Sequence, residues 1–159
     1  MNFERIDPFV DAVINVLTTM AFTTPRAGQA FERSHKRASE AKGDVTAIIG
    51  MTGQINGSMA VSFSERAILQ IVSNMFGEAC KEIDDDVHDA VGELCNMISG
   101  DARRALEGKG ISIQAAIPTV VSGRGHRITH AVSGPSTVIP FNVVEDAPFF
   151  IEICFDDNL

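Results

Sequence analysis

Apolar residues recur at helical spacing in three parts of the chain. Near the N-terminus they lie three or four positions apart, at Phe9, Val13, Val16, Leu17 and Met20. This pattern predicts an amphipathic helix that ends near residue 20. Asp7 is the expected N-cap of that helix, and Pro8 is its expected first residue.

Two further helices are predicted. One starts at Ser64-Glu65 and is closed by Gly77, because glycine favours the left-handed conformation that ends many helices. The other is much longer. It follows Asp84-Asp85-Asp86, which suits N-capping and the helix dipole, and it ends near Gly108-Lys109-Gly110.

Stretches rich in alternating or β-branched residues predict strands between and after these helices. In chain order they cover residues 43–51, 54–63, 111–121, 136–144 and 148–155, with the first hairpin turn at Thr52-Gly53 and a possible extended segment near 26–31. Residues 34–42 and 122–135 are expected to be loops. The predicted fold is therefore α+β, an antiparallel β-sheet with the first and long helices packed on one face.

A short internal similarity supports this arrangement. The tripeptide Asp-Ala-Val occurs at residues 11–13 of the first helix and again at residues 89–91 of the long helix. Strands that look antiparallel follow each of the two helices. The order of elements, more than the three identities, predicts a pseudo-twofold internal repeat.

Composition and charge limit the possible functions. The chain has 159 residues, so we expect a single domain spanning residues 1–159. Its formal net charge is −8, which argues against nucleic acid as a partner. We expect no membrane contact and a cytoplasmic location, because no apolar run could span a bilayer and Asp7 and Asp11 interrupt any signal-peptide core.

Several possible reactive groups are better explained by structure. Cys80, Cys95 and Cys154 match no metal or redox spacing, so we expect reduced and mostly buried thiols. His126 and His130 have a spacing that can serve a metal on a helix, but they lie in a predicted loop without a third ligand. No nucleophile elbow or phosphate-binding loop is present. We therefore expect neither a metal nor a cofactor on this chain.

The outward side of the long helix carries the most informative chemistry. With Leu94 facing the core, Glu93 and Asn96 project from the opposite side as neighbours at i and i+3. Small residues accompany them on that side, namely Gly92, Ser99 and Gly100. Each glycine costs about 1 kcal/mol of helix propensity relative to alanine, which favours a surface shaped for close approach by a partner.

These residues also carry a family resemblance. The segment Asp89-Ala-Val-Gly-Glu-Leu-Cys-Asn-Met-Ile-Ser-Gly100 resembles the signature helix of the CheC/CheX/FliY family of bacterial chemotaxis phosphatases. Further similar stretches occur at residues 2–17, 43–50, 57–64, 117–121 and 138–141, so the resemblance covers nearly the whole chain. Asn15 and Thr18 stand where the repeat would place a second Glu/Asn pair, which resembles the single-site arrangement of CheX.

The resemblance implies a fold, a reaction and a partner. The fold would be CheC-like, and the activity would be hydrolysis of the phospho-aspartate on a CheY-like response regulator in bacterial chemotaxis signalling. Asn96 would orient the attacking water, and Glu93 would dock the regulator by pairing with a lysine. Mg²⁺ would belong to the regulator, and the chain would form a homodimer through its sheet edges. We expect the regulator to contact the residues around the pair, Asp89, Gly92, Ser99, Gly100 and Arg103.

Two alternatives remain open at the level of sequence. The chain could be a non-catalytic module of the same fold that binds a regulator or a flagellar component. It could also be a structural dimer without a regulator partner. Loss of labelled phosphate from a cognate regulator distinguishes these possibilities from the phosphatase.

Overall fold

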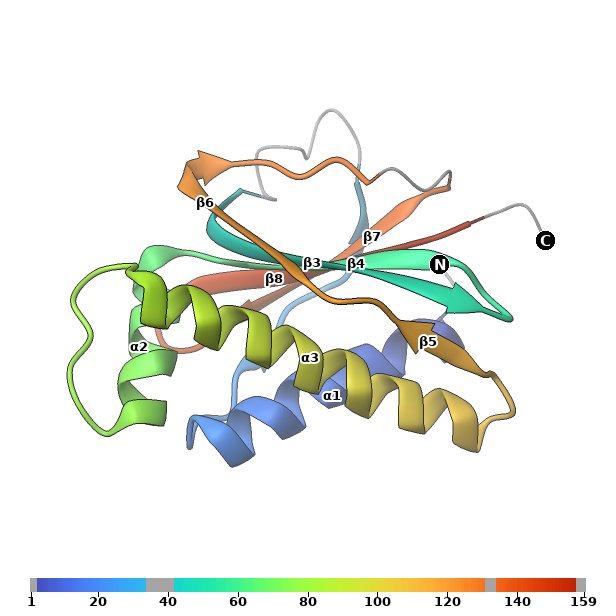
Figure 1. Ribbon diagram of the computed structural model, residues 1–159, viewed down its shortest axis with the longest axis horizontal. Coiled ribbons are helices and arrows are strands. Elements are labelled where there is room, and N and C mark those ends of the chain that lie inside the picture. Colours follow the sequence, from blue (N-terminus) through green and yellow to red (C-terminus); the bar gives the residue numbers. More distant parts are fainter. Residues whose placement is uncertain (1–2, 34–41, 131–133, 157–159) are drawn as a thin grey trace.

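The computed structural model describes residues 3–33, 42–130 and 134–156 (Figure 1). The helices in these ranges are α1 (Phe3–Met20), α2 (Glu65–Phe76) and α3 (Asp85–Gly108). The strands are β1 (Arg26–Ala27), β2 (Phe31–Glu32), β3 (Gly43–Gly53), β4 (Gly57–Phe63), β5 (Ile113–Ala115), β6 (Thr119–His126), β7 (Ser136–Asn142) and β8 (Pro148–Phe155). Most of the predicted loop at residues 34–42 lies outside the described residues.

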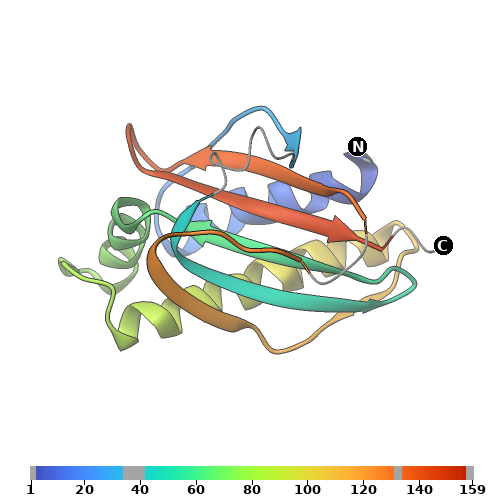
Figure 2. The same cartoon turned by 90° about the horizontal axis from the view of Figure 1, so that it is seen from above.

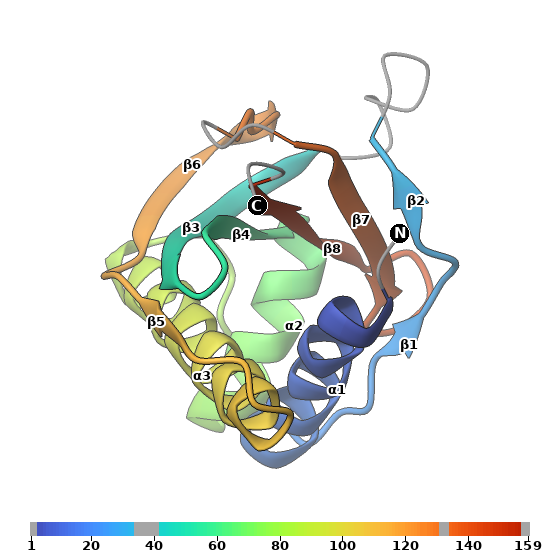
Figure 3. The same cartoon turned by 90° about the vertical axis from the view of Figure 1, so that its right-hand side faces the viewer.

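All strand pairings in the sheet are antiparallel. The order across it is β1-β7-β8-β4-β3-β5, with β2 also paired to β7 and β6 also paired to β3. The helices lie together against one face, as the view along them shows (Figure 3). The predicted α+β class is thus confirmed. The divided strands β1/β2 and β5/β6 form the two edges of the sheet. The predicted homodimer through a sheet edge stays a prediction.

The topology also contains the predicted repeat. Each half of the chain runs from a long helix through a divided edge strand to two long paired strands: α1, β1/β2, β3 and β4, then α3, β5/β6, β7 and β8. The edge strands are exchanged between the halves. β1 and β2 pair with β7 of the second half, whereas β5 and β6 pair with β3 of the first. The halves therefore complete one another's sheet.

The start of α1 differs from the prediction. The helix begins at Phe3, so Asp7 is not its N-cap and Pro8 lies inside it. Proline has no N–H to donate to the carbonyl four residues earlier, which is that of Glu4. Lys109, at the end of α3, donates to this carbonyl instead, with Nζ at 3.3 Å. The acceptor that proline leaves unused thus contacts the end of the other long helix.

The strand predicted over residues 111–121 is divided. Ala115 lies opposite Met51 and Thr119 lies opposite Ile48, so four steps on this side face three on β3. The extra residue makes a bulge between β5 and β6. Pro118 lies at this break, where its lack of an N–H would interrupt a regular ladder.

Two further boundaries differ. β6 continues to His126, so the connection predicted from Ser122 starts at Arg127. His126 Nε2 lies 2.5 Å from Thr46 Oγ1, which links this end of β6 to β3. The predicted β3–β4 hairpin is confirmed, but its turn covers residues 54–56 instead of Thr52-Gly53.

The caps of the other helices agree with the sequence. Ser64 is the N-cap of α2, its hydroxyl accepting from the Ala67 N–H, and Gly77 closes the helix with φ of +70°. Asp84 is the N-cap of α3, with Oδ1 accepting from the Val87 N–H at 3.0 Å. The acidic run before α3 therefore has the capping role expected of it.

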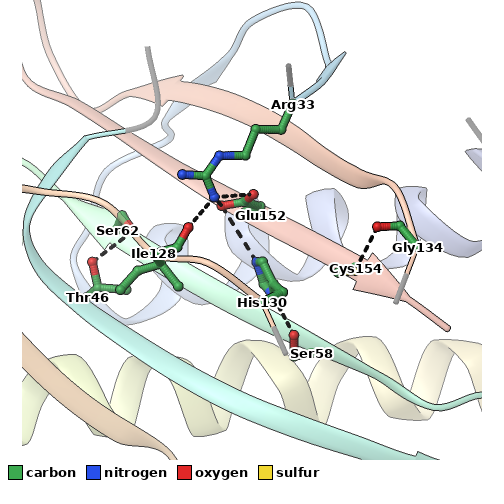
Figure 4. Close-up of polar contacts among 9 residues, drawn as sticks. All are labelled: Arg33, Thr46, Ser58, Ser62, Ile128, His130, Gly134, Glu152 and Cys154. Carbon is green, nitrogen blue, oxygen red and sulfur yellow. Dashed lines mark hydrogen bonds and ion pairs between the residues drawn. The ribbon is translucent and has the colours of Figure 1, made fainter. Parts of the chain in front are cut away.

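The central strands β4 and β8 are buried on both faces. Their inner face packs on the helices, and the outer face carries a polar group of residues (Figure 4). Glu152 of β8 is 1% exposed, and Arg33 Nη1 lies 3.0 and 3.2 Å from its two carboxylate oxygens. Arg33 also donates to the Ile128 carbonyl, while His130 contacts Ser58 and lies 3.6 Å from Glu152. Glu152 thus joins segments from both halves over the outer face.

Candidate functional site

Helix α3 positions Glu93 and Asn96. Its inner side packs against the sheet through a stripe of buried residues, Val87, Val91, Leu94, Ile98 and Ala102. Glu93 and Asn96 are both exposed, one turn apart, on the side that faces α1. The prediction that this pair projects outward is confirmed.

The pair lies in a cleft between two helices. α1 and α3 run side by side beneath the sheet (Figure 2). The cleft between them has a volume of about 450 Å³. It is lined by Asn15, Val16, Thr19 and Met20 from α1 and by Glu93, Asn96, Met97, Gly100, Asp101 and Arg104 from α3. A carboxylate and a carboxamide therefore share one opening with an apolar floor and a second group of polar residues.

This second polar group connects the two helices. Asn15 Nδ2 donates to Asp101 Oδ2 at 2.8 Å. The other carboxylate oxygen of Asp101 pairs with Arg104 Nη2 one turn along α3. Asp101 and Arg104 were not predicted as site residues, and Asn15 was noted only as the position in the repeat that corresponds to Glu93. The i, i+3 spacing of Asp101 and Arg104 was a usable signal, whereas the contact with Asn15 depends on how the helices pack.

Two of the predicted partner-binding residues are placed differently from the prediction. Ser99 is 4% exposed, and its hydroxyl donates to the Asn96 carbonyl at 3.0 Å. Gly92 is half-buried, and a Cβ added to it would lie 3.4 Å from Val120 Cγ2 on β6. Because β6 packs along this flank of α3, the absence of a side chain at Gly92 has a packing reason.

The remaining predicted residues are at least partly accessible. Gly100 lines the cleft one turn after Asn96, as expected of a residue that lets a partner come close. Asp89 is exposed and Arg103 is half-buried, but neither belongs to the cleft lining. The cation that the structure brings to the cleft is Arg104, the neighbour of the predicted one.

The two histidines considered as metal ligands contact other parts of the sheet instead. His126 Nδ1 donates to the Gly123 carbonyl and its Nε2 contacts the Thr46 hydroxyl, while His130 contacts Ser58, so the two histidines face different partners. Within the described ranges, no group of three His, Cys, Asp or Glu residues could hold a metal ion. No helix in those ranges is long and apolar enough to cross a membrane.

The cysteines are free thiols of unequal accessibility. Cys95 and Cys154 are buried, while Cys80 is half-buried. Burial raises the pKa of the Cys95 thiol to about 12, because its thiolate would be desolvated in the core. Cys95 therefore remains protonated at neutral pH and belongs to the packing of α3, not to its outward face.

Comparison with known proteins decides the family. The family model described as "Chemotaxis phosphatase CheX" matches residues 45–142, a range that includes α3 with Glu93 and Asn96. The chain belongs to the CheX family. Among its curated relatives, the CheY-P phosphatase CheX of Thermotoga maritima is 29% identical over 154 residues, covering 96% of each protein.

Solved CheX structures share the fold. The chemotaxis protein CheX of Vibrio vulnificus is 39% identical, with a TM-score of 0.90 over 96% of this chain and 99% of that one. The CheX of a CheX–CheY–BeF₃–Mg²⁺ complex from Borrelia burgdorferi has a TM-score of 0.79 over 96% and 97% of the two chains. At 23% identity, this last similarity concerns the fold alone.

In this CheX-family chain, α1 does not repeat the Glu/Asn pair. Asn15 occupies the position related to Glu93 and is held by Asp101. Thr18 occupies the position related to Asn96, and its hydroxyl lies 3.3 Å from that of Thr24. The structure thus places a single Glu/Asn pair, on α3, beside the cleft.

Proposed function

We propose that the chain accelerates hydrolysis of the phospho-aspartate on a CheY-like response regulator. The observation that carries this proposal is the exposed Glu93/Asn96 pair at the α1–α3 cleft of a CheX-family fold. The names of two relatives support it, a CheY-P phosphatase and a CheX solved in complex with CheY. The regulator supplies the phosphoryl group and the Mg²⁺.

Asn96 is the residue proposed to act on the reacting water. In the reaction the water oxygen forms a bond to phosphorus, the bond between phosphorus and the aspartyl oxygen breaks, and the carboxylate leaves. A carboxamide can accept a hydrogen bond from the water and donate another to an oxygen beside it. The glutamine of small GTPases orients water in a comparable way. Asn96 is exposed and one turn from a glycine, so it can enter a partner's active site.

Glu93 is proposed to dock the regulator. A carboxylate close to a phosphoryl group would repel its oxygens, which disfavours Glu93 as a direct base. An ammonium group on the regulator is a better partner for it, because the pair would fix the approach of Asn96, one turn away. This division of roles predicts different kinetic effects for the two residues.

The test follows loss of radiolabelled phosphate from a CheY-like regulator, with and without the protein. Asn96→Ala should lower the accelerated rate at least about 100-fold, in the range of other transition-state contacts, while the regulator still binds. Glu93→Ala should weaken binding as well as turnover. Gln114→Ala, which removes an exposed amide on β5, is the matched control. Full activity of Asn96→Ala would refute the mechanism.

The same assay addresses the alternative that the protein is a non-catalytic or structural module. A regulator-binding module would bind the regulator without changing its rate of phosphate loss. A purely structural protein would do neither.

A further inference from the structure

The cleft contains one cation among its described lining residues, Arg104, which lies beside Gly100. A Cβ added to Gly100 would lie 3.7 Å from Arg104 Nη1, so the guanidinium lies over the glycine. Long side chains on a helix point back toward its N-terminus. Arg104 accordingly extends from its own turn toward the turn that carries Asn96.

Asp101 holds this guanidinium, and Asn15 of α1 holds Asp101. Arg104 Nη2 pairs with one oxygen of Asp101, and the other oxygen accepts from Asn15 of α1. Asp101 is 22% exposed and Arg104 is 64% exposed, so the pair has a partly buried anchor and an open cation. A guanidinium has five N–H donors. Among the described residues, Asp101 accepts from one nitrogen of Arg104, Nη2.

A surface ion pair for helix stability would not need this arrangement. Pairs of exposed residues at i, i+3 contribute between zero and about 1 kcal/mol, and they require neither a tether to a second helix nor a glycine beneath the cation. The arrangement instead leaves several donors directed into the opening that Asn96 shares. Planar guanidinium donors bind carboxylate and phosphate oxygens well.

Arg104 is the charged group of the cleft that can meet an anion on the partner. The cleft lining carries the carboxylates Glu93 and Asp101 and, among its described residues, the single cation Arg104. A phospho-aspartate site must present phosphoryl oxygens and the carboxylates that hold Mg²⁺. An acidic chain with net charge −8 would repel such a surface unless a local cation faced it.

We propose that Arg104 is a positioning residue that binds an anionic oxygen group of the regulator, either a carboxylate or the phosphoryl group, and so sets the approach of Asn96. This inference rests on the proposed function. Arg104 lies eight residues beyond Asn96, about 12 Å along the helix axis. Its side chain covers part of that distance, so its contact lies beside the reacting phosphorus and not at it.

The test measures binding of the regulator at 50 and 200 mM salt, with and without beryllofluoride as a stable phosphoryl mimic. Arg104→Ala should weaken binding of the beryllofluoride form about tenfold at 50 mM salt and should reduce the salt dependence. Arg104→Lys should recover part of the affinity. Arg66→Ala, which removes an exposed cation in the first turn of α2, should bind as the unsubstituted protein does.

The two forms of the regulator distinguish the two sources of the anion. An equal loss with both forms identifies a carboxylate, and a loss confined to the beryllofluoride form identifies the phosphoryl group. Wild-type affinity of Arg104→Ala for both forms would overturn the inference. These readouts need no hydrolysis, so full turnover by Asn96→Ala would refute the proposed mechanism, and the binding of the anionic group by Arg104 would still be tested on its own. Absence of binding by the unsubstituted protein would refute both.

Discussion

The buried ion pair on the outer face of the sheet makes a quantitative prediction about stability. Arg33 directly follows β2, and its side chain is 17% exposed. Glu152 lies in β8, and its side chain is 1% exposed. The substitution Arg33→Met leaves the Glu152 carboxylate without the guanidinium, with His130 Nε2 at 3.6 Å as its remaining neighbour, and leaves the Ile128 carbonyl without this donor. Glu152→Leu leaves Arg33, which is nearer the surface and can turn toward water.

The expected magnitudes follow from this asymmetry. At 3.0 Å the attraction is about 5 kcal/mol for an effective dielectric constant of ~20. Desolvation of both groups offsets much of that in the intact pair. Removal of one partner of a buried pair costs about 3–5 kcal/mol, and we expect this for Arg33→Met. Glu152→Leu should cost less, and the double variant should cost less than Arg33→Met alone.

Denaturant unfolding measures the free energy of unfolding of the unsubstituted protein, the two single variants and the double variant. All four must be compared at one protein concentration, because association would add to the apparent stability. Unchanged m-values would show that the native state remains compact. Single costs that add to the double cost within about 0.5 kcal/mol would show that the residues are not coupled. A cost below about 1 kcal/mol for Arg33→Met would also refute the reasoning.

Two further predictions concern α3. Gly100→Leu should leave thermal stability unchanged or slightly raised, because leucine has the better helix propensity and an added Cβ would lie 3.7 Å from the flexible end of the Arg104 side chain. Turnover of the regulator should nevertheless fall at least about tenfold. Normal turnover would show that the cleft is not the docking site. A thiol reagent at pH 8 should label Cys80 in the native protein and spare Cys95, whose pKa is raised from 9.0 to about 12 by burial. The contribution of the protonated Cys95 thiol to the free energy of unfolding should be complete below pH 9 and be lost as the pH rises toward 12. Rapid labelling of Cys95 in the native protein would contradict its burial.

The site was predictable where it depended on one helix. Glu93 and Asn96 follow from the apolar stripe of α3 alone, because a 3.6-residue period fixes which residues point away from the core. The same reasoning was wrong at Ser99, which is 4% exposed and donates to the Asn96 carbonyl. A helical wheel contains no information about neighbours at its sides.

The parts that required pairing of distant segments were not predictable. Asn15 and Asp101 are 86 positions apart, and only the packing of α1 on α3 brings them together. The outer polar group combines four separate segments in the same way. Glu152 was the available signal, a single carboxylate in the apolar run from Pro148 to Phe155, but its partner Arg33 lay beyond any local pattern.

The exchanged edge strands have a consequence for the protein during its synthesis. β3 ends at residue 53, yet its outer partners β5 and β6 are complete only at residue 126. At 5–20 residues per second, the ribosome needs roughly 4–15 seconds to add that stretch. Throughout this interval β3 presents an open hydrogen-bonding edge, and the segment that becomes β1 and β2 waits still longer for β7. Nascent chains on neighbouring ribosomes therefore expose unpaired strand edges at the same time.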